Sequence, residues 1–526
     1  MKLTNDKASS RPLGVAEKLV NHSIDEITVY SKLVILTGEK TALKTKNGRW
    51  CFFDALSLLS RVVGNLTVIL PNDTDPLFVK KVNDFCSRAW CRGTLSVVHG
   101  IKPSLFKKAD AILSIGSKVK PSLPWTTVNS NGWVARVTSC STPLPNSLNQ
   151  ENAPAALFAA SLGVTEVFKR IFNIPHDTSP LFNKTEFSLF EQTTNPTWIG
   201  PPLPDKITIP DTLLNGAGAI GNGIALLLSQ TPFEGRVHVI DKQNYNEENL
   251  GTCILLNKED WLQQPKAKRI ARWLNNNSNL EVTGKKSLIE TAIQEQEFSE
   301  LTIDLVLNGF DDVNARNSSQ NLWPSTIIDG GINEVGAAVI QHRLDQNQFA
   351  CLKCWFQPKK TNEKIIQSKL TGLDIESLRD TGRLLTTDDI THANKDMREW
   401  LQKYKNSGKT ICSIISEAVL ANKLGVEVEE GFRPSAPFVA TASAALVVAE
   451  AIKSLCFPKT PVVPMFQIAN LFLGPEKTSI KLNKKPSPTC QCVIHRRLID
   501  QLLNNRKASM VVENYESMES DSLLPH

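Results

Sequence analysis

At residues 213–221 the chain reads LLNGAGAIG, an apolar run that leads into three glycines with the spacing G-x-G-x-x-G. Residues 224–228, IALLL, continue as a helix-like stretch. Small residues let the backbone approach phosphates, and a helix N-terminus offers free N–H groups and a partial positive charge. Asp241 follows the next predicted strand, 237–240, where its carboxylate can accept hydrogen bonds from ribose hydroxyls. The stretch therefore predicts a Rossmann-like nucleotide site. A dehydrogenase, or a glycine turn that only packs a strand on a helix, also fits these residues alone.

Strand-like and helix-like segments alternate in two regions of the chain, which predicts an α/β fold with mainly parallel sheets. In the first region we expect strands at 33–37, 66–70, 95–98 and 111–115, and helices at 50–63 and 77–90. In the second we expect strands at 213–214, 237–240, 304–307 and 326–328, and helices at 224–228 and 266–274. The proline-rich stretch Pro175–Pro210 between them reads as a linker or an irregular connection.

The two regions look like copies of one another. Residues 160–169, ASLGVTEVFK, are similar to residues 444–453, AALVVAEAIK, and residues 111–116 occupy the same relative place as 305–309. Chance similarity between helix-forming residues is the plainer explanation, but the matches occur in the same order, which favours a duplication. The first copy has one glycine, Gly38, where the second has its glycine-rich loop, so we expect it to be degenerate and non-catalytic.

Composition narrows the class of protein. A chain of 526 residues is too long for one ordinary core and predicts two or three domains. A net charge of +6 is too mild to indicate a nucleic-acid partner. We find no apolar run near the ~20 residues that cross a bilayer and no secretory signal, so we expect a cytoplasmic protein without a membrane partner. Eleven cysteines, an odd number, favour a reducing compartment, in which thiols serve as metal ligands or catalysts.

Three further motifs follow Asp241: Asn249-Leu250, Pro265-Lys266-Ala267, and the stretch FDDVNAR at residues 310–316. As a set, this series resembles the ThiF/MoeB and ubiquitin-activating-enzyme superfamily. The resemblance covers residues 211–356 well and residues 410–456 more loosely. It implies that the nucleotide is ATP, and that the chain adenylates the C-terminal carboxylate of a ubiquitin-like protein. It also implies two Rossmann-like adenylation domains that form a pseudo-dimer, one inactive and one active.

The resemblance assigns roles to single residues. It implies that Gly216, Gly218 and Gly221 cradle ATP, Asp241 binds the ribose, Asn249 lies at the phosphate region, Lys266 contacts the phosphates, and Asp311 holds Mg²⁺. Negative charge that gathers at the α-phosphate needs such metal and cationic groups. Arg316 is then either a site-organising residue or an ion-pair partner on the following helix.

Some alternatives stay open at this point. Asp312 could replace Asp311 as the metal ligand, and Lys266 could be a solvated helix lysine, because Lys268 and Arg269 stand beside it. The superfamily usually continues Asn-Leu with one residue and then Arg-Gln, whereas this chain has Thr252 at the arginine position. Either another basic residue supplies that charge, for instance from the first half, or the ATP chemistry is weakened.

Two cysteine pairs are candidates for a structural zinc site. Cys351 and Cys354 form a C-x-x-C pair, and Cys490 and Cys492 form a C-x-C pair near the end of the folded region. Superfamily members often hold zinc with two distant cysteine pairs, and a tetrahedral Cys₄ site joins distant segments. The superfamily usually has C-x-x-C in the second pair as well, which leaves His495 as an alternative fourth ligand. A redox C-x-x-C is the other interpretation.

Cys412 is the candidate catalytic thiol. It lies in the stretch KTICSII at residues 409–415, which resembles the segment around the catalytic cysteine of ubiquitin-activating enzymes. A thiolate there could attack the adenylate and carry the protein as a thioester. A buried structural cysteine is the alternative, because isoleucines surround it. Cys253, beside the nucleotide motifs, is a distant second candidate.

The sequence thus predicts an ATP-dependent activating enzyme that passes a ubiquitin-like carrier protein to a conjugating enzyme. The expected organisation is a degenerate domain at 1–185, the active domain at 205–350, a zinc-pair and catalytic-cysteine region at 351–435, a return to the active domain at 436–500, and a flexible tail at 505–526. The alternatives are a ThiF/MoeB-like sulfur-carrier adenylyltransferase and a non-catalytic scaffold subunit. A homodimer or a second subunit is compatible with each of them.

Overall fold

The computed structural model describes residues 7–91, 93–100, 103–146, 149–257, 261–295, 302–310, 313–333, 335–343, 350–356, 367–368, 370–415, 418, 436–458, 466–476 and 480–506. The chain divides into two compact units, one formed by residues 1–355 and 435–526 and the other by residues 356–434.

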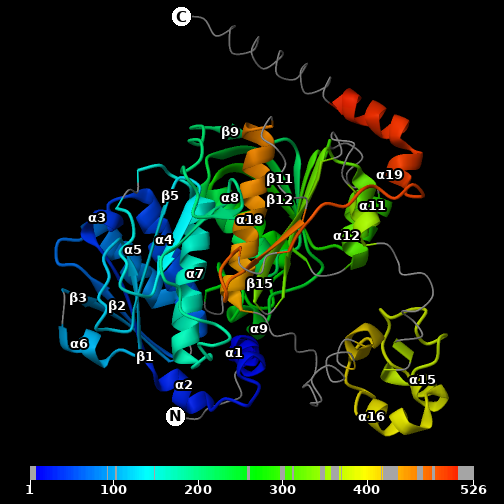
Figure 1. The fold of residues 1–526 in the computed structure, drawn as a ribbon. Coiled ribbons are helices and arrows are strands. Elements are labelled where there is room, and N and C mark those ends of the chain that lie inside the picture. Colours follow the sequence, from blue (N-terminus) through cyan, green and yellow to red (C-terminus); the bar gives the residue numbers. More distant parts are fainter. Residues whose placement is uncertain are drawn as a thin grey trace, which may run out of the picture. The chain divides into compact units, whose positions relative to one another are not determined.

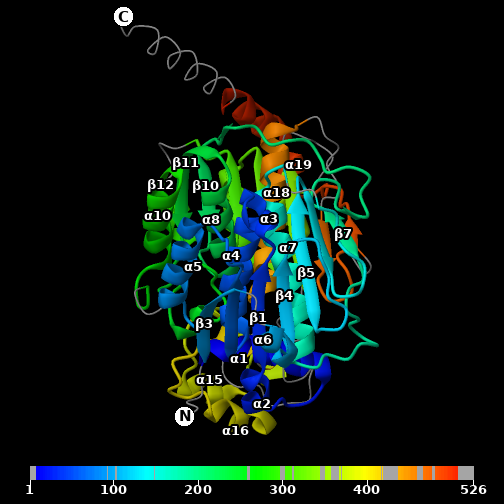
Figure 2. The ribbon, with the colours of Figure 1, turned by 90° about the vertical axis from the view of Figure 1, so that its left-hand side faces the viewer.

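Two β-sheets of the same topology form the larger unit. The first sheet has the strand order β3 (Thr94–His99), β2 (Asn65–Leu70), β1 (Leu33–Gly38), β4 (Ala111–Ile115), β5 (Trp125–Asn131), β6 (Val134–Thr138), β7 (Thr185–Ser188), β8 (Thr193–Thr194). The second has the order β12 (Asn279–Lys285), β11 (Phe233–Ile240), β10 (Thr212–Asn215), β13 (Leu305–Asn308), β14 (Thr326–Ile332), β15 (Gly336–Arg343), β16 (Phe466–Asn470), β17 (Ile480–Leu482), with β9 (Ile207–Thr208) beside β11. In each sheet the first five strands of this order are parallel and the rest antiparallel. Figure 2 looks toward the first sheet, in which β1, β4 and β5 run side by side.

Helices connect and cover these strands. In the larger unit they are α1 (Lys7–Val20), α2 (Glu26–Ser31), α3 (Lys40–Leu43), α4 (Lys46–Val62), α5 (Pro76–Arg88), α6 (Pro103–Lys108), α7 (Ala153–Ile171), α8 (Ala219–Gln230), α9 (Glu247–Leu250), α10 (Lys266–Asn277), α11 (Ile289–Gln294), α12 (Val313–Ser319), the 3₁₀ turn η1 (Gln320–Leu322), α13 (Leu352–Trp355), α18 (Pro437–Cys456) and α19 (Gln491–Ile494). We call residues up to 194 the first half and the remainder of this unit the second half.

The two halves share detail as well as topology. The helices α7 and α18, which carry the two similar sequence stretches, each bury a lysine that pairs with a glutamate three residues earlier. Lys169 Nζ lies 2.6 Å from Glu166, and Lys453 Nζ lies 2.5 Å from Glu450. Each lysine also donates to a backbone carbonyl of the first half. The chain therefore contains two Rossmann-like domains arranged as a pseudo-dimer, as the sequence predicted.

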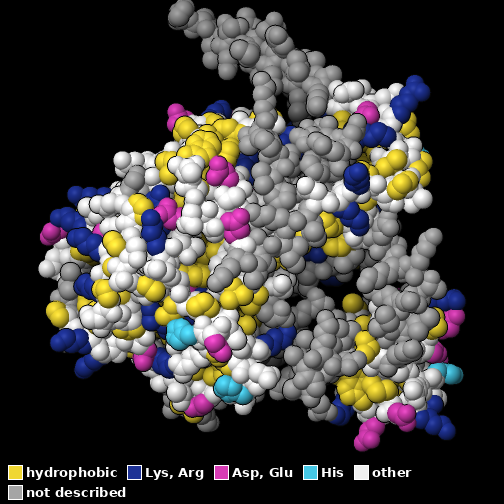
Figure 3. Space-filling model, viewed as in Figure 1, with side chains coloured by type: hydrophobic (Ala, Val, Ile, Leu, Met, Phe, Trp, Pro, Cys, Tyr) yellow, Lys and Arg dark blue, Asp and Glu magenta, His cyan; other side chains and the backbone are white. Residues whose placement is uncertain are grey.

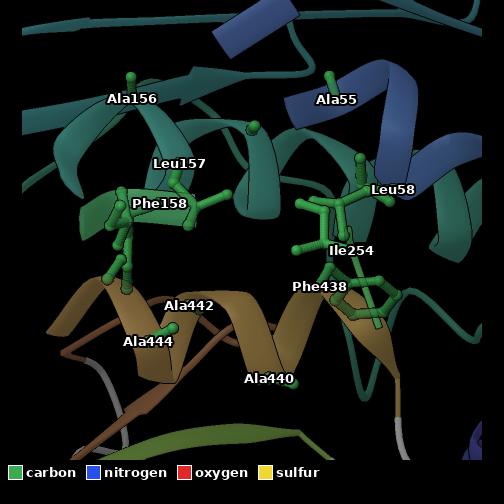
Figure 4. Packing of buried hydrophobic residues seen from close by; sticks show 14 of the residues in the cluster. Ala55, Leu58, Ala156, Leu157, Phe158, Ile254, Phe438, Ala440, Ala442 and Ala444 are labelled. Carbon is green, nitrogen blue, oxygen red and sulfur yellow. The ribbon is translucent and has the colours of Figure 1, made fainter. Parts of the chain in front are cut away.

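The core of the pseudo-dimer is a helical layer between the two sheets. In Figure 1, α7 and α18 run side by side, with the first sheet on one side and the second on the other. Ser161 of α7 and Thr441 of α18 share a hydrogen bond of 2.9 Å between their hydroxyls. Figure 4 shows Leu58, Ile254 and Phe438, from segments far apart in the sequence, in one hydrophobic cluster. This single core spans both halves and holds them together.

Helix α18 corrects one sequence expectation. A window of 18 residues within this 20-residue helix has a mean hydropathy of 1.6, which by length and composition is enough to cross a membrane. In the structure, 89% of that window is buried inside the fold. Its apolar character comes from packing against α7, α8 and the second sheet, so the expectation that no apolar run approaches this length was wrong.

Most expected strands and helices are present, with ends displaced by a few residues. The expectation of a linker at Pro175–Pro210 was wrong in part, because β7 and β8 complete the first sheet and β9 pairs with β11. These strands have only two to four residues each, too few for an alternating pattern to be visible in the sequence.

On the face of the first half that Figure 3 shows, basic and acidic side chains are interspersed, and neither sign forms a separate patch.

The smaller unit, residues 356–434, has its own hydrophobic core. Its described elements are α15 (Thr387–His392), the 3₁₀ turn η2 (Lys395–Met397) and α16 (Arg398–Gln402). Arg383 forms two hydrogen bonds with the Asp389 carboxylate, at 2.7 and 2.5 Å. The chain between α13 and α18 therefore contains a separate compact unit, and the first cysteine pair belongs to the larger unit.

A carboxyl group is buried between the two halves. Asp54 of α4 accepts a 3.4 Å hydrogen bond from Gln230 of α8, and its other oxygen has no hydrogen-bond partner among the described residues. Burial raises the pKa of Asp54 to about 8, whereas an unfolded aspartate titrates near 4. Between these values the folded state keeps a proton that the unfolded state releases, so stability falls as pH rises toward 8.

We expect Asp54→Asn to remove that loss. In urea unfolding, the free energy of unfolding of the wild type should fall between pH 6 and pH 8 by roughly 2 kcal/mol more than that of the variant. Asp84→Asn, the same change at an exposed position of α5, should leave the pH dependence unchanged. Parallel pH profiles for wild type and Asp54→Asn would contradict the assignment.

Candidate functional site

The glycine-rich loop between β10 and α8 has the geometry of a phosphate cradle. Gly216 has φ +87°, a conformation that L side chains rarely adopt, and a Cβ at Gly221 would stand 1.9 Å from the Gly216 carbonyl oxygen. A Cβ at Gly218 would meet no atom within 4 Å. Gly216 and Gly221 are therefore required by the loop itself, while Gly218 borders open space at the N-terminus of α8, where backbone N–H groups favour anions.

Two residues that the sequence analysis missed hold this loop in place. Asn222 Nδ2 donates to the carbonyls of Ala217 and Gly218, at 2.8 and 2.9 Å, and lies 2.9 Å from the Tyr245 hydroxyl. Tyr245 is fully buried, and burial raises the pKa of its phenol well above the usual value. An asparagine inside an otherwise apolar helix was the signal in the sequence, since a buried amide needs partners.

Asp241 lies at the end of β11, beside the loop, as predicted. Its Oδ2 accepts a 2.8 Å hydrogen bond from the Ala217 backbone N–H, and its Oδ1 accepts one of 2.7 Å from Gln243 N. The carboxylate thus braces the glycine loop. It is only partly buried, so its remaining lone pairs stay available to a ligand hydroxyl.

Lys266 opens α10 and is 4% exposed, whereas Lys268 on the same helix is exposed. Its Nζ donates to Gln243 Oε1 at 2.8 Å and lies 5.7 Å from the centre of the Tyr245 ring. The interpretation of Lys266 as a solvated helix lysine is therefore wrong. No carboxylate partner of this ammonium is found among the described residues, which leaves two of its three donors for an anion.

Asn249 is buried in the short helix α9, where its side chain has a structural task. Asn249 Oδ1 accepts a 3.0 Å hydrogen bond from Asn246 N and completes a capping box. Its backbone carbonyl accepts from Thr252 N and Cys253 N, at 3.2 and 2.8 Å. These bonds fix the turn that follows α9.

Arg316 of α12 is an ion-pair partner of Asp329 and also bonds two backbone carbonyls. Its Nη2 donates to the carbonyls of Phe310 and Gly330, at 2.8 and 3.0 Å, and its Nε lies 3.1 Å from Asp329 Oδ1. Burial raises the pKa of Asp329 to about 6, while Arg316 opposes that shift. The arginine thus ties together the ends of β13 and β14. Asp311 and Asp312, which follow Phe310, lie outside the described residues.

Thr252, which replaces the expected arginine, is 2% exposed and offers no positive charge. Two arginines of the first half come close to this place. Arg11 of α1 lies 2.8 Å from Glu248 of α9, and Arg61 of α4 donates to the backbone carbonyls of the segment after α9. The first half therefore contacts α9 and the segment that follows it with two basic side chains.

In the first half, an internal carboxylate fills the corresponding place. Glu39 follows β1 as Gly216 follows β10, and its Oε1 accepts from the backbone N–H groups of Ser117 and Lys118, at 2.8 and 2.6 Å. A Cβ on Gly116 would approach the Glu39 carboxyl carbon to 2.4 Å. The Glu39 side chain thus occupies two backbone donors that follow β4.

The four cysteines of the two predicted pairs converge in one buried cluster. All four Sγ atoms lie within 4.8 Å of one another. The Sγ distances are 3.8 Å for Cys351–Cys354, 3.6 Å for Cys351–Cys490 and 3.5 Å for Cys354–Cys492. Tetrahedral zinc with Zn–S bonds of about 2.3 Å requires S···S distances of about 3.8 Å. The donor set fits zinc, and exposed His495 is not part of this group.

Cys412 lies in the smaller unit and is exposed, whereas Ile411 and Ile414 beside it are fully buried. Its backbone N–H donates to the Thr381 carbonyl at 2.8 Å. The interpretation of Cys412 as a buried core thiol is therefore wrong. Cys253 is fully buried, and burial raises the pKa of its thiol, which argues against a nucleophilic role.

Among curated proteins, the chain matches the uncharacterized protein y4jF of Sinorhizobium fredii with 25% identity over 323 residues. That match spans 60% of this chain but only 59% of the relative's length. Among solved structures, E. coli MccB with ATP is 16% identical with a TM-score of 0.34, covering 55% of this chain and 68% of MccB. MccB with MccA-N7isoASN gives the same identity and TM-score, over 54% and 67%.

A family model gives the broadest match. The model of the ThiF family matches residues 191–492, a range that includes the glycine loop, Asp241, Lys266, Arg316 and the four clustered cysteines. This range is more than half of the 526 residues. The protein belongs to the ThiF family.

Proposed function

We propose that this chain binds MgATP in the second half and adenylates a carboxylate at the C-terminus of a ubiquitin-like carrier protein. The observation that carries the proposal is the buried ammonium of Lys266, linked through Gln243 to Asp241 and the glycine loop. A cation held in a buried site without a carboxylate partner among the described residues suits an anionic ligand. Membership of the ThiF family supports ATP as that ligand.

The reaction assigns each group a task. The carrier carboxylate attacks the α-phosphorus of ATP, a P–O bond to the β-phosphate breaks, and pyrophosphate leaves. The N-terminus of α8 and Lys266 offset the negative charge of the phosphates, and Asp241 receives the ribose hydroxyls. Mg²⁺ supplies further charge neutralisation when bound, and Asp311 is the residue that we propose to hold it.

Arg11 is the residue that we propose in place of the arginine missing at Thr252. It is 26% exposed and lies on α1, and it reaches α9 through Glu248. Its contact with a partly exposed glutamate can be exchanged for a phosphate at small cost, because surface ion pairs contribute little. Arg61 cannot take this role, because its donors are occupied by carbonyl and hydroxyl oxygens.

Two measurements test the adenylation proposal. Isothermal titration with MgATP alone should show one site per chain. Pyrophosphate exchange should appear when ubiquitin-like proteins that end in Gly-Gly are added one by one. Binding that requires no divalent cation, or exchange that occurs without any carrier, would contradict the reaction as written.

The second step that we propose is transfer of the carrier to Cys412. The Cys412 thiol loses its proton, its sulfur attacks the acyl-adenylate carbonyl, a C–S bond forms, and AMP leaves. Exposure of this thiol on a separate compact unit suits a residue that must meet both a carrier and a conjugating enzyme. A structural zinc ion at the four clustered cysteines completes the proposed cofactors.

We expect Cys412→Ala to abolish an ATP-dependent, thiol-sensitive adduct while leaving pyrophosphate exchange within about 3-fold of wild type. Non-reducing gels with a labelled carrier measure the adduct, and Cys412→Ser should yield an adduct that resists reducing agents. Cys140→Ala, at another exposed cysteine, is the matched control and should keep the adduct. A persistent adduct in Cys412→Ala would rule out this thiol. Thiocarboxylate formation with sulfide would point instead to a sulfur-carrier activator.

A further inference from the structure

We infer that the degenerate first half sets the ATP affinity of the second half, with Arg61 as the positioning residue that does so. The inference deepens the proposed function and rests on it for the identity of the nucleotide. It concerns the turn after α9, residues 251–256, which Arg61 contacts directly from α4.

Arg61 is 2% exposed, and oxygen atoms surround its guanidinium. Its Nε donates to the Cys253 carbonyl at 3.1 Å, and its Nη2 donates to the carbonyls of Ile254 and Leu256, at 3.0 and 2.6 Å. Its Nη1 donates to the carbonyl and hydroxyl of Ser57. Burial lowers the pKa of Arg61 to about 10, so the group stays charged at neutral pH. One side chain of the first half thus satisfies three carbonyls of the second.

A second contact from the same face of α4 adds to the hydrogen bonds of Arg61. We call Arg61 and Ser57, with their hydrogen bonds to residues 253–256, the clamp. The Ser57 hydroxyl donates to the Ile254 carbonyl at 2.8 Å. Ser57 and Arg61 are four residues apart and therefore lie on the same face of α4. Buried hydrogen bonds are directional, whereas apolar contacts are not. These bonds therefore fix the position of the backbone carbonyls in the turn, and do not merely keep the turn buried.

The clamp connects to the nucleotide site through one residue. Cys253, whose carbonyl accepts from Arg61, donates its own N–H to the Asn249 carbonyl at 2.8 Å. The side chain of Asn249 in turn forms part of the capping box of α9. Arg61 is therefore linked to Asn249 across two hydrogen bonds, one to the Cys253 carbonyl and one from the Cys253 N–H. Glu248, which precedes Asn249 in α9, is the partner of Arg11.

Lysine cannot replace Arg61 in this arrangement. Its single nitrogen lacks the planar fork of a guanidinium, which spreads donors over separated acceptors. In Arg61→Lys, at least one of the three carbonyls would lose its donor inside the protein, and the turn would shift to find water or another partner. Charge and side-chain bulk would be largely retained, so this variant isolates the geometry of the hydrogen bonds.

The test compares MgATP binding and exchange kinetics across three variants. In Arg61→Lys we expect the KM for ATP and the Kd for MgATP to rise roughly 5- to 50-fold, with kcat and the KM for the carrier within about 3-fold of wild type. Ser57→Ala should show a smaller shift in the same direction. Arg88→Gln, at an exposed arginine of α5 whose Nε donates to the Asp84 carbonyl of the same helix, should match wild type.

Hydrogen exchange provides a readout that does not depend on the reaction. Amides of residues 249–256 should lose protection in Arg61→Lys, while the central strands β1 and β10 keep theirs. Unchanged Kd and unchanged protection in a folded Arg61→Lys protein would overturn the inference. If wild type fails to bind MgATP, the proposed function fails. Hydrogen exchange at the amides of residues 249–256 still decides whether Arg61 holds the turn. If Arg61→Lys does not fold, Ser57→Ala decides the same question.

Discussion

Replacing Cys354 or Cys492 with serine should strip the protein of one bound zinc ion and lower its free energy of unfolding by more than about 3 kcal/mol. Structural zinc contributes apparent binding free energies of roughly 10 kcal/mol or more, and this contribution is part of folding. The two cysteines are separated by 138 residues in the chain but their sulfurs lie 3.5 Å apart. The ion would thus join the start of α13 to the start of α19.

The neighbourhood of the cluster explains why the loss should spread. Ile499 and Leu503 of the C-terminal segment pack on the cysteines, and Lys484 donates to the Cys354 carbonyl at 2.6 Å. Hydrogen bonds from Cys351 and Cys492 lower the pKa of Cys354, whereas the pKa values of Cys351 and Cys492 are raised. Without the ion, no bonds would join the two cysteine pairs, and the segment from 484 to 506 would lose its anchor.

Metal analysis by mass spectrometry and urea unfolding measure the two effects. Cys140→Ser, at an exposed cysteine of the first half, is the control for loss of a thiol and should retain zinc and stability. His495→Ala should also retain zinc, because His495 lies outside the group of four. Wild-type protein that is purified without chelators and contains no zinc would refute the assignment, and loss of zinc in His495→Ala would mean a different ligand set.

The sequence predicted the parts of the fold that local chemistry decides. Gly216 and Gly221 stand where only a residue without Cβ fits, and Asp241 follows its strand at the required distance, so motif and structure agree. The duplication was visible in ten residues of α7 and α18 because their buried Glu–Lys pairs constrain the sequence. The four cysteines could be paired because zinc ligands have few substitutes.

Contacts across the pseudo-dimer could not be predicted in the same way. Arg61 looked like an ordinary helix arginine, and only the fold brings it to the carbonyls of residues 253–256. Lys266 and Lys268 are indistinguishable by type, and burial alone separates them. The strands β7 and β8 were missed because two to four residues that pair at a sheet edge leave no periodic pattern.

Lys266→Ala should lower kcat/KM for ATP-dependent pyrophosphate exchange roughly 100- to 1,000-fold, the range found when a buried donor to a developing negative charge is removed. The same change should leave the free energy of unfolding unchanged or higher. Without nucleotide, the buried ammonium has one neutral acceptor, Gln243 Oε1, and no carboxylate partner among the described residues. Such a group destabilises the empty protein, because desolvation of the charge is poorly compensated.

Opposite effects on activity and stability would distinguish a ligand-binding lysine from a structural one. Lys268→Ala, two residues on and exposed, should change neither quantity, which controls for the loss of a positive charge on α10. Thermal unfolding with MgATP adds a third readout: the nucleotide should stabilise wild type and Lys268→Ala, and should stabilise Lys266→Ala far less. If Lys266→Ala lost stability in proportion to activity, Lys266 would be a packing residue, and the site would need another cation for the phosphates.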